Sequence, residues 1–416
     1  MKKILSLVMA LIVIIAVSVP MATLAGEETA GGDNTTVKSE TGEVVEAVEE
    51  VESVETVEAV ESVETVEAVE AVTVIDTLTL EKAYETIEEH NQELKLMNDK
   101  INLYEKQYQE AVARSDWARG KSIGGDEEQN VTYRKEELLY PKQRLLELDG
   151  AKHEREEKLK ELKAGVKKQY LEIGVFQEEL ANTQSELAAL DKTIEHTQTQ
   201  INSGSLPQSA LKPYDAQRVQ MLSRIETTQR QISLNLKGLE RDLGVKLAEP
   251  TKLEPLAGEL VLFDDGDIAN EISKAWEDSY DYLSQQGQLE LAEIECDIIR
   301  YNTYIDNNLN QLHQLEASVS NNQAKLEQVK PNLEATLWNK YYELKNLEGD
   351  LEIEKINLED AEYTLSITQS KEGLGTAKES SVVDDTIALN QQKVKLQKAI
   401  NAYSLAVDEL NNLLIK

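Results

Sequence analysis

The sequence is poor in aromatic residues and nearly lacks cysteine. Aromatic residues make up 5% of its 416 residues, with two phenylalanines and three tryptophans, which is too few to fill a large globular core. The single cysteine, Cys296, excludes an internal disulfide. Leu, Glu, Gln, Asn and Lys are abundant instead, and this composition is typical of long helices that bury a thin apolar seam. The sequence therefore predicts a nearly all-α protein.

Basic residues and histidines are also scarce. The chain has 43 Lys and Arg against 78 Asp and Glu, a net charge of −35, and no stretch concentrates basic residues on one face. This excludes ordinary nucleic-acid binding. The four histidines stand far apart, without metal-ligand spacing, and Gly373-x-Gly375 has neither the preceding strand nor the Gly-Lys-Ser of a phosphate loop. We therefore expect no catalysis, no metal and no cofactor.

The first 76 residues differ from the rest of the chain. Residues 1–25 have the charged start, apolar core and small-residue cleavage site of an export signal; an uncleaved anchor is the alternative. Residues 26–76 form an acidic Val-Glu tract in which valine recurs at every third position from Val45 to Val72. A period of three gathers the valines on no helical or strand face, so we expect an extended or fluctuating tether. A transient helix is the alternative.

The stretch from Leu180 to Leu243 predicts a long helical hairpin. Apolar positions alternate by three and four on both sides of Ser203-Gly204-Ser205-Leu206-Pro207, and this spacing is typical of a coiled-coil seam. Gly and Pro between the two runs reverse the chain. The expected seam consists of Leu180, Thr183, Leu187, Leu190, Ile194, Thr197 and Ile201 on the way in, and Leu222, Ile225, Gln229, Ile232, Leu236, Leu239 and Leu243 on the way out.

A second hairpin repeats this pattern around Gly373-Leu374-Gly375-Thr376. Its rising seam has Glu354 as a polar interruption, and its descending seam has Lys393 as a misfit. The spacing from Gly204 to Asp215 equals the spacing from Gly373 to Asp384. Two hairpins in one register predict an internal duplication. We expect a first hairpin repeat at 77–247, a linker at 248–266 and a second repeat at 267–416.

Local signals fix further expectations. Thr79 is the expected N-cap of the first helix, with Glu81 in its first turn. The helical pattern breaks between residues 120 and 130 and resumes near Pro141. In the linker, Leu260-Val261-Leu262-Phe263 is a candidate for one short strand.

The chain resembles the TolC-like outer-membrane efflux family from Thr77 to Lys416. The resemblance rests on Leu78-Thr79-Leu80-Glu81-Lys82-Ala83 with Asn91-Gln92-Glu93-Leu94, on the two glycine tips each followed by Asp, on the closing Ala402-Tyr403…Ala406-Val407-Asp408-Glu409-Leu410, and on the duplication.

This resemblance implies a homotrimer in which each protomer contributes two hairpins to a hollow α-barrel. It implies passive conduction of exported small molecules or peptides, with the hairpin tips docking on an adaptor (membrane-fusion) protein that works with a membrane exporter. It also implies a position in the cell envelope, at the outer membrane. The family's membrane strands belong near 115–139 and 306–330, where this sequence offers only Val131-Thr132-Tyr133 as strand material and otherwise keeps helical spacing. We therefore expect an α-barrel protomer with little or no β-barrel.

The tip residues Gly204, Leu206, Gly373, Leu374 and Gly375 are the candidate partner-binding site. The glycines permit the turns whatever the tips touch, whereas exposed leucines at a turn favour docking. Two functions remain open at this point. One is an exported efflux or secretion component, and the other is an extracellular coiled-coil protein with a structural or regulatory role and no conduit.

Overall fold

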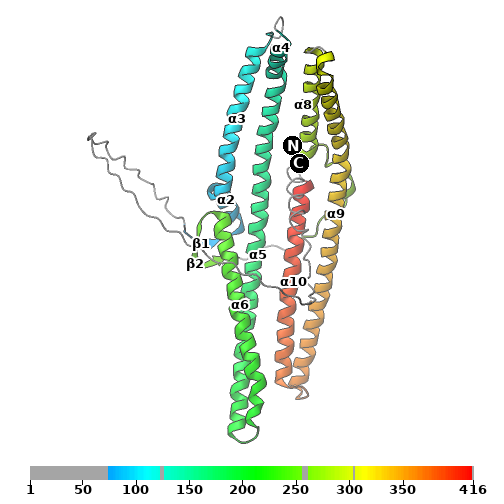
Figure 1. Ribbon diagram of the computed structural model, residues 1–416. Helices are drawn as coiled ribbons and strands as arrows, with labels where there is room; N and C mark the ends of the chain where they lie inside the picture. Colours follow the sequence, from blue (N-terminus) through cyan, green and yellow to red (C-terminus); the bar gives the residue numbers. More distant parts are fainter. Residues whose placement is uncertain (1–73, 122–125, 255–260, 303–304, 415–416) are drawn as a thin grey trace, which may run out of the picture. The chain divides into compact units, whose positions relative to one another are not determined.

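The computed structural model describes residues 74–121, 126–254, 261–302 and 305–414 (Figure 1). The expected export signal and the tether as far as residue 73 lie outside the described residues. Within them the chain is helical almost throughout, so the predicted all-α fold class is confirmed.

The first half holds two short strands and the first hairpin. Its elements, in chain order, are β1 (Val74–Leu78), α2 (Leu80–His90), α3 (Gln92–Ala118), α4 (Glu127–Arg134), a π-helical turn (Lys135–Leu139), α5 (Tyr140–Asn202), a 3-10 turn (Gln208–Leu211), α6 (Lys212–Leu243) and β2 (Lys246–Leu253). Helix α3 packs along the first part of α5, and α6 packs along its last part. Val131–Tyr133, the only candidate strand material in this region, lies in α4.

The second half follows the same plan. Its elements are α7 (Ile268–Lys274), α8 (Tyr280–Asn302), α9 (Ile305–Gly373) and α10 (Glu379–Leu414). Helix α8 packs on the first part of α9, and α10 packs on its last part. Helix α9 runs through residues 306–330, as the helical spacing predicted.

Side-chain caps set where the first two helices begin. The Thr79 hydroxyl accepts a hydrogen bond from the Lys82 amide, so the predicted N-cap is confirmed. Asn91 separates α2 from α3, and its side-chain oxygen accepts from the Leu94 amide. Its side-chain nitrogen donates to the Asp242 carbonyl oxygen at 2.8 Å. The start of the folded body is therefore tied to the end of α6.

A small parallel sheet and a core lie beside the middle of α5. Strand β1 pairs with β2, with Val74 opposite Lys246 and Leu78 opposite Leu253. The strand expected at 260–263 is therefore wrong in place: residues 261–263 form no regular element, and Leu260 lies outside the described residues. The strand forms at Lys246–Leu253 instead, because β1 pairs with it and supplies its hydrogen-bond partners. The apolar run at 261–263 has no partner strand among the described residues, and a single strand forms no ladder.

Tyr170 closes this core. Its ring is buried among the apolar side chains of α2, α5 and α6. Its hydroxyl lies 2.9 Å from the Leu78 carbonyl oxygen and 2.5 Å from that of Glu254, at the ends of the two strands. The sheet is therefore fixed to α5 through its backbone.

A second core lies where the linker meets α9 and α10. Tyr403, which is fully buried, accepts a hydrogen bond from the Phe263 amide at 2.8 Å. The Tyr341 hydroxyl donates to the Asp265 carboxylate at 2.9 Å. These two bonds hold the chain before α7 against the second hairpin.

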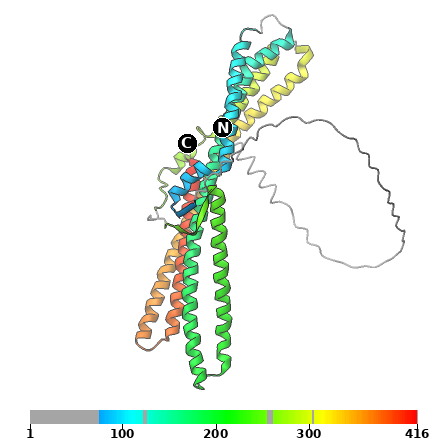
Figure 2. The same ribbon diagram turned by 90° about the vertical axis from the view of Figure 1, so that its left-hand side faces the viewer.

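The two hairpins pack on one another through α5 and α10. The Lys167 ammonium lies 2.5 Å from the Asp408 carboxylate, and the Lys398 ammonium lies 2.7 Å from that of Glu179. Residue numbers increase along α5 from Lys167 to Glu179, whereas those of their partners on α10 decrease from Asp408 to Lys398. The two helices are therefore antiparallel. The end of α5 and the start of α10, and hence both tips, therefore lie at the same end of this part of the chain (Figures 1 and 2).

The predicted seams are correct in most places and wrong at three. Leu222 and Gln229 are exposed, and Met221 and Thr228 take their places in the first hairpin. Both sets keep a three-four alternation that shares Ile225 and Ile232, so spacing alone does not separate them.

The third seam error concerns Lys393, which is exposed. Its neighbour Gln392 is buried, and the Gln392 amide donates to the Glu354 carboxylate. The polar interruption on one side of the second hairpin is therefore matched by a polar partner on the other.

In the described parts of the chain, each helix is either too short or too polar to cross a lipid bilayer.

Candidate functional site

The two hairpin tips have the same turn geometry. Gly204 has φ 76°, its amide donates to the Ile201 carbonyl, and the Ser205 amide donates to Gln200. Gly375 has φ 72°, and it and Thr376 donate in the same pattern, three and five positions back. Left-handed backbone favours glycine, and this pair of bonds closes a helix C-terminus.

The counterpart of Gly204 is therefore Gly375, and we call the difference between their residue numbers the repeat offset. Gly373, which the equal spacing to the following Asp had aligned with Gly204, is the last residue of α9 and has helical backbone. That equal spacing is thus not a structural equivalence. The repeat offset also relates Tyr170 to Tyr341 and Leu243 to Leu414.

Both tip leucines are exposed, at different positions of the turn. Leu206 follows its left-handed glycine by two positions and is 37% exposed. Leu374 precedes its glycine by one position and is 79% exposed. Each hairpin thus ends in one exposed apolar side chain, and the two lie at the same end of the paired hairpins.

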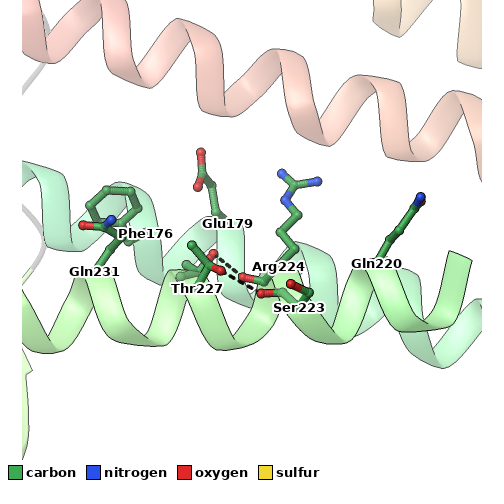
Figure 3. A pocket seen from close by; sticks show the side chains of 8 residues that line it. Phe176, Glu179, Gln220, Ser223, Arg224, Thr227 and Gln231 are labelled. Carbon is green, nitrogen blue, oxygen red and sulfur yellow. Dashed lines mark hydrogen bonds between the residues drawn. The ribbon is translucent and has the colours of Figure 1, made fainter. Parts of the chain in front are cut away.

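A shallow groove runs along each hairpin above its tip. The first, of about 420 Å³, lies between α5 and α6 and is lined by residues that include Phe176, Glu179 and Arg224. Figure 3 shows Glu179 and Arg224 both pointing out of this helix pair. Glu179 accepts from Lys398 of α10. One residue that lines the first groove is therefore bound by a side chain of the second hairpin.

The second groove, of about 370 Å³, lies between α9 and α10. Its lining includes Leu347, Asp350 and Lys395, which the repeat offset relates to Phe176, Glu179 and Arg224. The two grooves are thus the same site in the two halves of the chain. Seam periodicity placed Leu347 on the rising seam of the second hairpin but did not identify the other groove residues named here, although the constant repeat offset in the printed sequence would have aligned them.

One buried carboxyl lies deeper in the first hairpin. Glu186 is buried on the face of α5 toward α6, and its pKa is raised because burial disfavours the charged form, while nearby Arg224 acts in the opposite direction. Among the described residues, no group of three or more His, Cys, Asp and Glu side chains is arranged to hold a metal ion.

Comparison with known proteins identifies the fold. No family model matches the sequence, and the comparison with curated proteins gives no match. Solved structures do match. CusC shares 13% identity, with 80% of this chain and 91% of CusC covered at a TM-score of 0.60. The outer-membrane channel OprN shares 10%, with 80% and 89% covered at 0.60.

VceC, an outer membrane protein of Vibrio cholerae, shares 12% identity, with 80% of this chain and 95% of VceC covered at a TM-score of 0.55. These matches span almost the whole length of each channel at low identity, so they concern the fold. The described chain has the fold of the TolC-like outer-membrane channels.

Proposed function

We propose that the chain is an exported TolC-like efflux or secretion component. It acts as a passive helical conduit or docking tube outside the cell membrane, and works as a homotrimer with an adaptor (membrane-fusion) protein and a membrane exporter. The observation that carries the proposal is the likeness to outer-membrane channels over 80% of this chain. Exported small molecules or peptides pass through the tube without chemical change, so the protein needs no catalytic residue and no cofactor.

The tips support the docking part of the proposal. Leu206 and Leu374 expose apolar surface at the end of long helices, where a polar residue would cost nothing in stability. Gly204 and Gly375 allow tight turns, so the leucines project beyond the helix ends. Gly373 is the last residue of α9 and precedes the turn.

Replacement of both tip leucines tests this docking. We expect Leu206→Asp with Leu374→Asp to abolish binding to the adaptor proteins of the same organism, measured by interferometry, while helicity by circular dichroism stays unchanged. Leu96→Asp with Leu103→Asp is the control, because these leucines are also exposed but lie on α3. Equal binding by the tip variant and the control would refute docking through the tips.

An extracellular coiled-coil protein without a conduit is the second candidate. The ion pairs between α5 and α10 favour it, because they let the two hairpins of one chain pack on each other as in a closed monomer. Such a protein would be a closed monomer or a simple dimer and would ignore adaptor proteins. A ring of several copies is incompatible with it.

A further inference from the structure

The helix that leads into α5 changes its hydrogen bonding at one place. Helix α4, the π-helical turn and α5 follow one another without a gap. In the turn the Tyr140 amide donates to the Lys135 carbonyl, which lies five residues back instead of four. Pro141, in the first turn of α5, has no amide hydrogen to donate. The α-helical ladder is therefore interrupted between Lys135 and Pro141, a stretch that we call the junction.

The second half of the chain has an unbroken helix at the equivalent place. By the repeat offset, Leu312 stands for Pro141, and it lies buried inside α9. Helix α9 contains a proline of its own, Pro331, and stays α-helical on both sides of it. A proline within a helix is thus not enough to produce a π-helical turn here. The junction distinguishes the first half from the second.

A side chain of α3 completes the bonding of the junction. The Glu137 carbonyl lies four residues before Pro141, so it lacks the amide donor that an α-helix would supply. The Ser115 hydroxyl donates to this carbonyl at 2.8 Å, and Ser115 itself is 8% exposed. A buried carbonyl that loses its donor costs more free energy than one ordinary hydrogen bond contributes. The junction therefore depends on a hydroxyl from a neighbouring helix.

Packing holds the part of the chain before the junction only weakly. Leu139, at the end of the turn, is buried, whereas α4 has no buried residue. The Tyr133 ring of α4 meets the edge of the exposed Trp117 ring of α3, with centroids 5.6 Å apart. The Lys135 ammonium lies 2.6 Å from the Glu295 carboxylate of α8, in a partly exposed ion pair that adds little stability. Elements with so few buried contacts open at low cost.

We propose that the junction is a hinge and that the Ser115 hydroxyl is its latch. With the latch closed, the Glu137 carbonyl is bonded and α4 keeps the position seen in Figures 1 and 2. With the latch open, water takes the place of the hydroxyl at this carbonyl, and α4 turns about the junction. Helix α4 lies at the end of α5 away from the tip, so the movement changes that end of the chain and leaves the tips in place. The hinge goes beyond the proposed function and does not depend on the number of copies.

Hydrogen exchange of the full chain, read in peptides from α4 and the junction, tests the latch. We expect Ser115→Ala to speed this exchange about tenfold, because the Glu137 carbonyl then has no donor in the closed state. Pro141→Ala restores an amide four residues after Glu137. In that background Ser115→Ala should change exchange by at most about twofold. Pro331→Ala is the matched control, since it restores an amide in α9 and should leave the full effect of Ser115→Ala.

Distances between spin labels test the movement. Labels at Gln129→Cys on α4 and Lys152→Cys on α5 span the junction, and both positions are exposed. Cys296→Ala removes the native thiol, and dilution with unlabelled chain restricts the measurement to distances within one chain. We expect Ser115→Ala to broaden the distance distribution of this pair. Lys152→Cys with Glu178→Cys, both on α5, is the control pair and should keep its distribution.

The outcomes decide between a latch, a hinge and neither. Faster exchange that Pro141→Ala cancels, together with a broader distribution across the junction, supports the proposal. An effect of Ser115→Ala that is equal with and without Pro141→Ala overturns the latch. Faster exchange with an unchanged distribution means local fraying and overturns the hinge. Ser115→Thr keeps a hydroxyl and should exchange at about the unsubstituted rate; exchange as fast as in Ser115→Ala would exclude the hydroxyl as the latch.

Discussion

Gly373 and Gly375 lie two positions apart at the second tip, and replacing each by alanine has opposite expected effects. Gly375 has φ 72°, where a Cβ costs about 1 kcal/mol. Gly373 has helical backbone, where alanine gains about 0.5 kcal/mol over glycine. A Cβ added at either position meets no atom within 4 Å, so the difference comes from the backbone alone.

Hydrogen exchange of the last turns of α9, followed by mass spectrometry, is the appropriate assay, because a tip opens locally without global unfolding. We expect about fivefold faster exchange in Gly375→Ala and about twofold slower exchange in Gly373→Ala. Gly204→Ala should behave like Gly375→Ala, at the first tip. Slower exchange in Gly375→Ala, or equal effects of the two substitutions, would refute the assignment of Gly375 as the turn residue.

Three further predictions concern the interior. Tyr170→Phe should lower the free energy of unfolding in urea by about 1–2 kcal/mol, because it removes the donor to the strand ends. Tyr341→Phe should change it far less, since the Asp265 carboxylate that loses this donor keeps its ion pair with Lys345. Glu354→Leu should cost about 1–3 kcal/mol because it removes the carboxylate acceptor of the buried Gln392 amide and leaves only the Glu354 backbone carbonyl, at 3.4 Å. Adding Gln392→Leu should recover the lost stability, and an unchanged unfolding midpoint in the single variant contradicts this. For Glu186 the folded-state pKa is raised, so stability falls as pH rises from the unfolded to the folded pKa. Glu186→Gln should therefore stabilise the protein above that window and leave it unchanged below, and a gain of equal size at all pH values would exclude ionisation as the cause.

Periodicity in the sequence predicted the fold class because this protein buries its apolar residues in long seams. The three-four alternation around residues 203–207 and 373–376 placed both hairpins, and Thr79 gave the first N-cap. The same alternation failed at Leu222, since a seam shifted by one position keeps the same spacing and only the position of the partner helix decides between them.

Long-range pairing set what the sequence did not predict. The short strand formed at Lys246–Leu253 because β1 offers it hydrogen-bond partners and Tyr170 holds both strand ends. The equivalence of Gly204 with Gly375 depended on backbone conformation rather than on residue type. Gly373 and Gly375 are the same residue, but only Gly375 has a positive φ. The tip leucines were identified from their place in the turn, whereas the groove residues required the repeat offset.

The mass of the full chain in solution, measured by light scattering together with its hydrodynamic radius, tests the conduit most directly. We expect an elongated assembly of three copies. A strict monomer at every concentration would leave no tube to conduct through, and it would contradict the conduit in favour of a coiled-coil protein of structural or regulatory function.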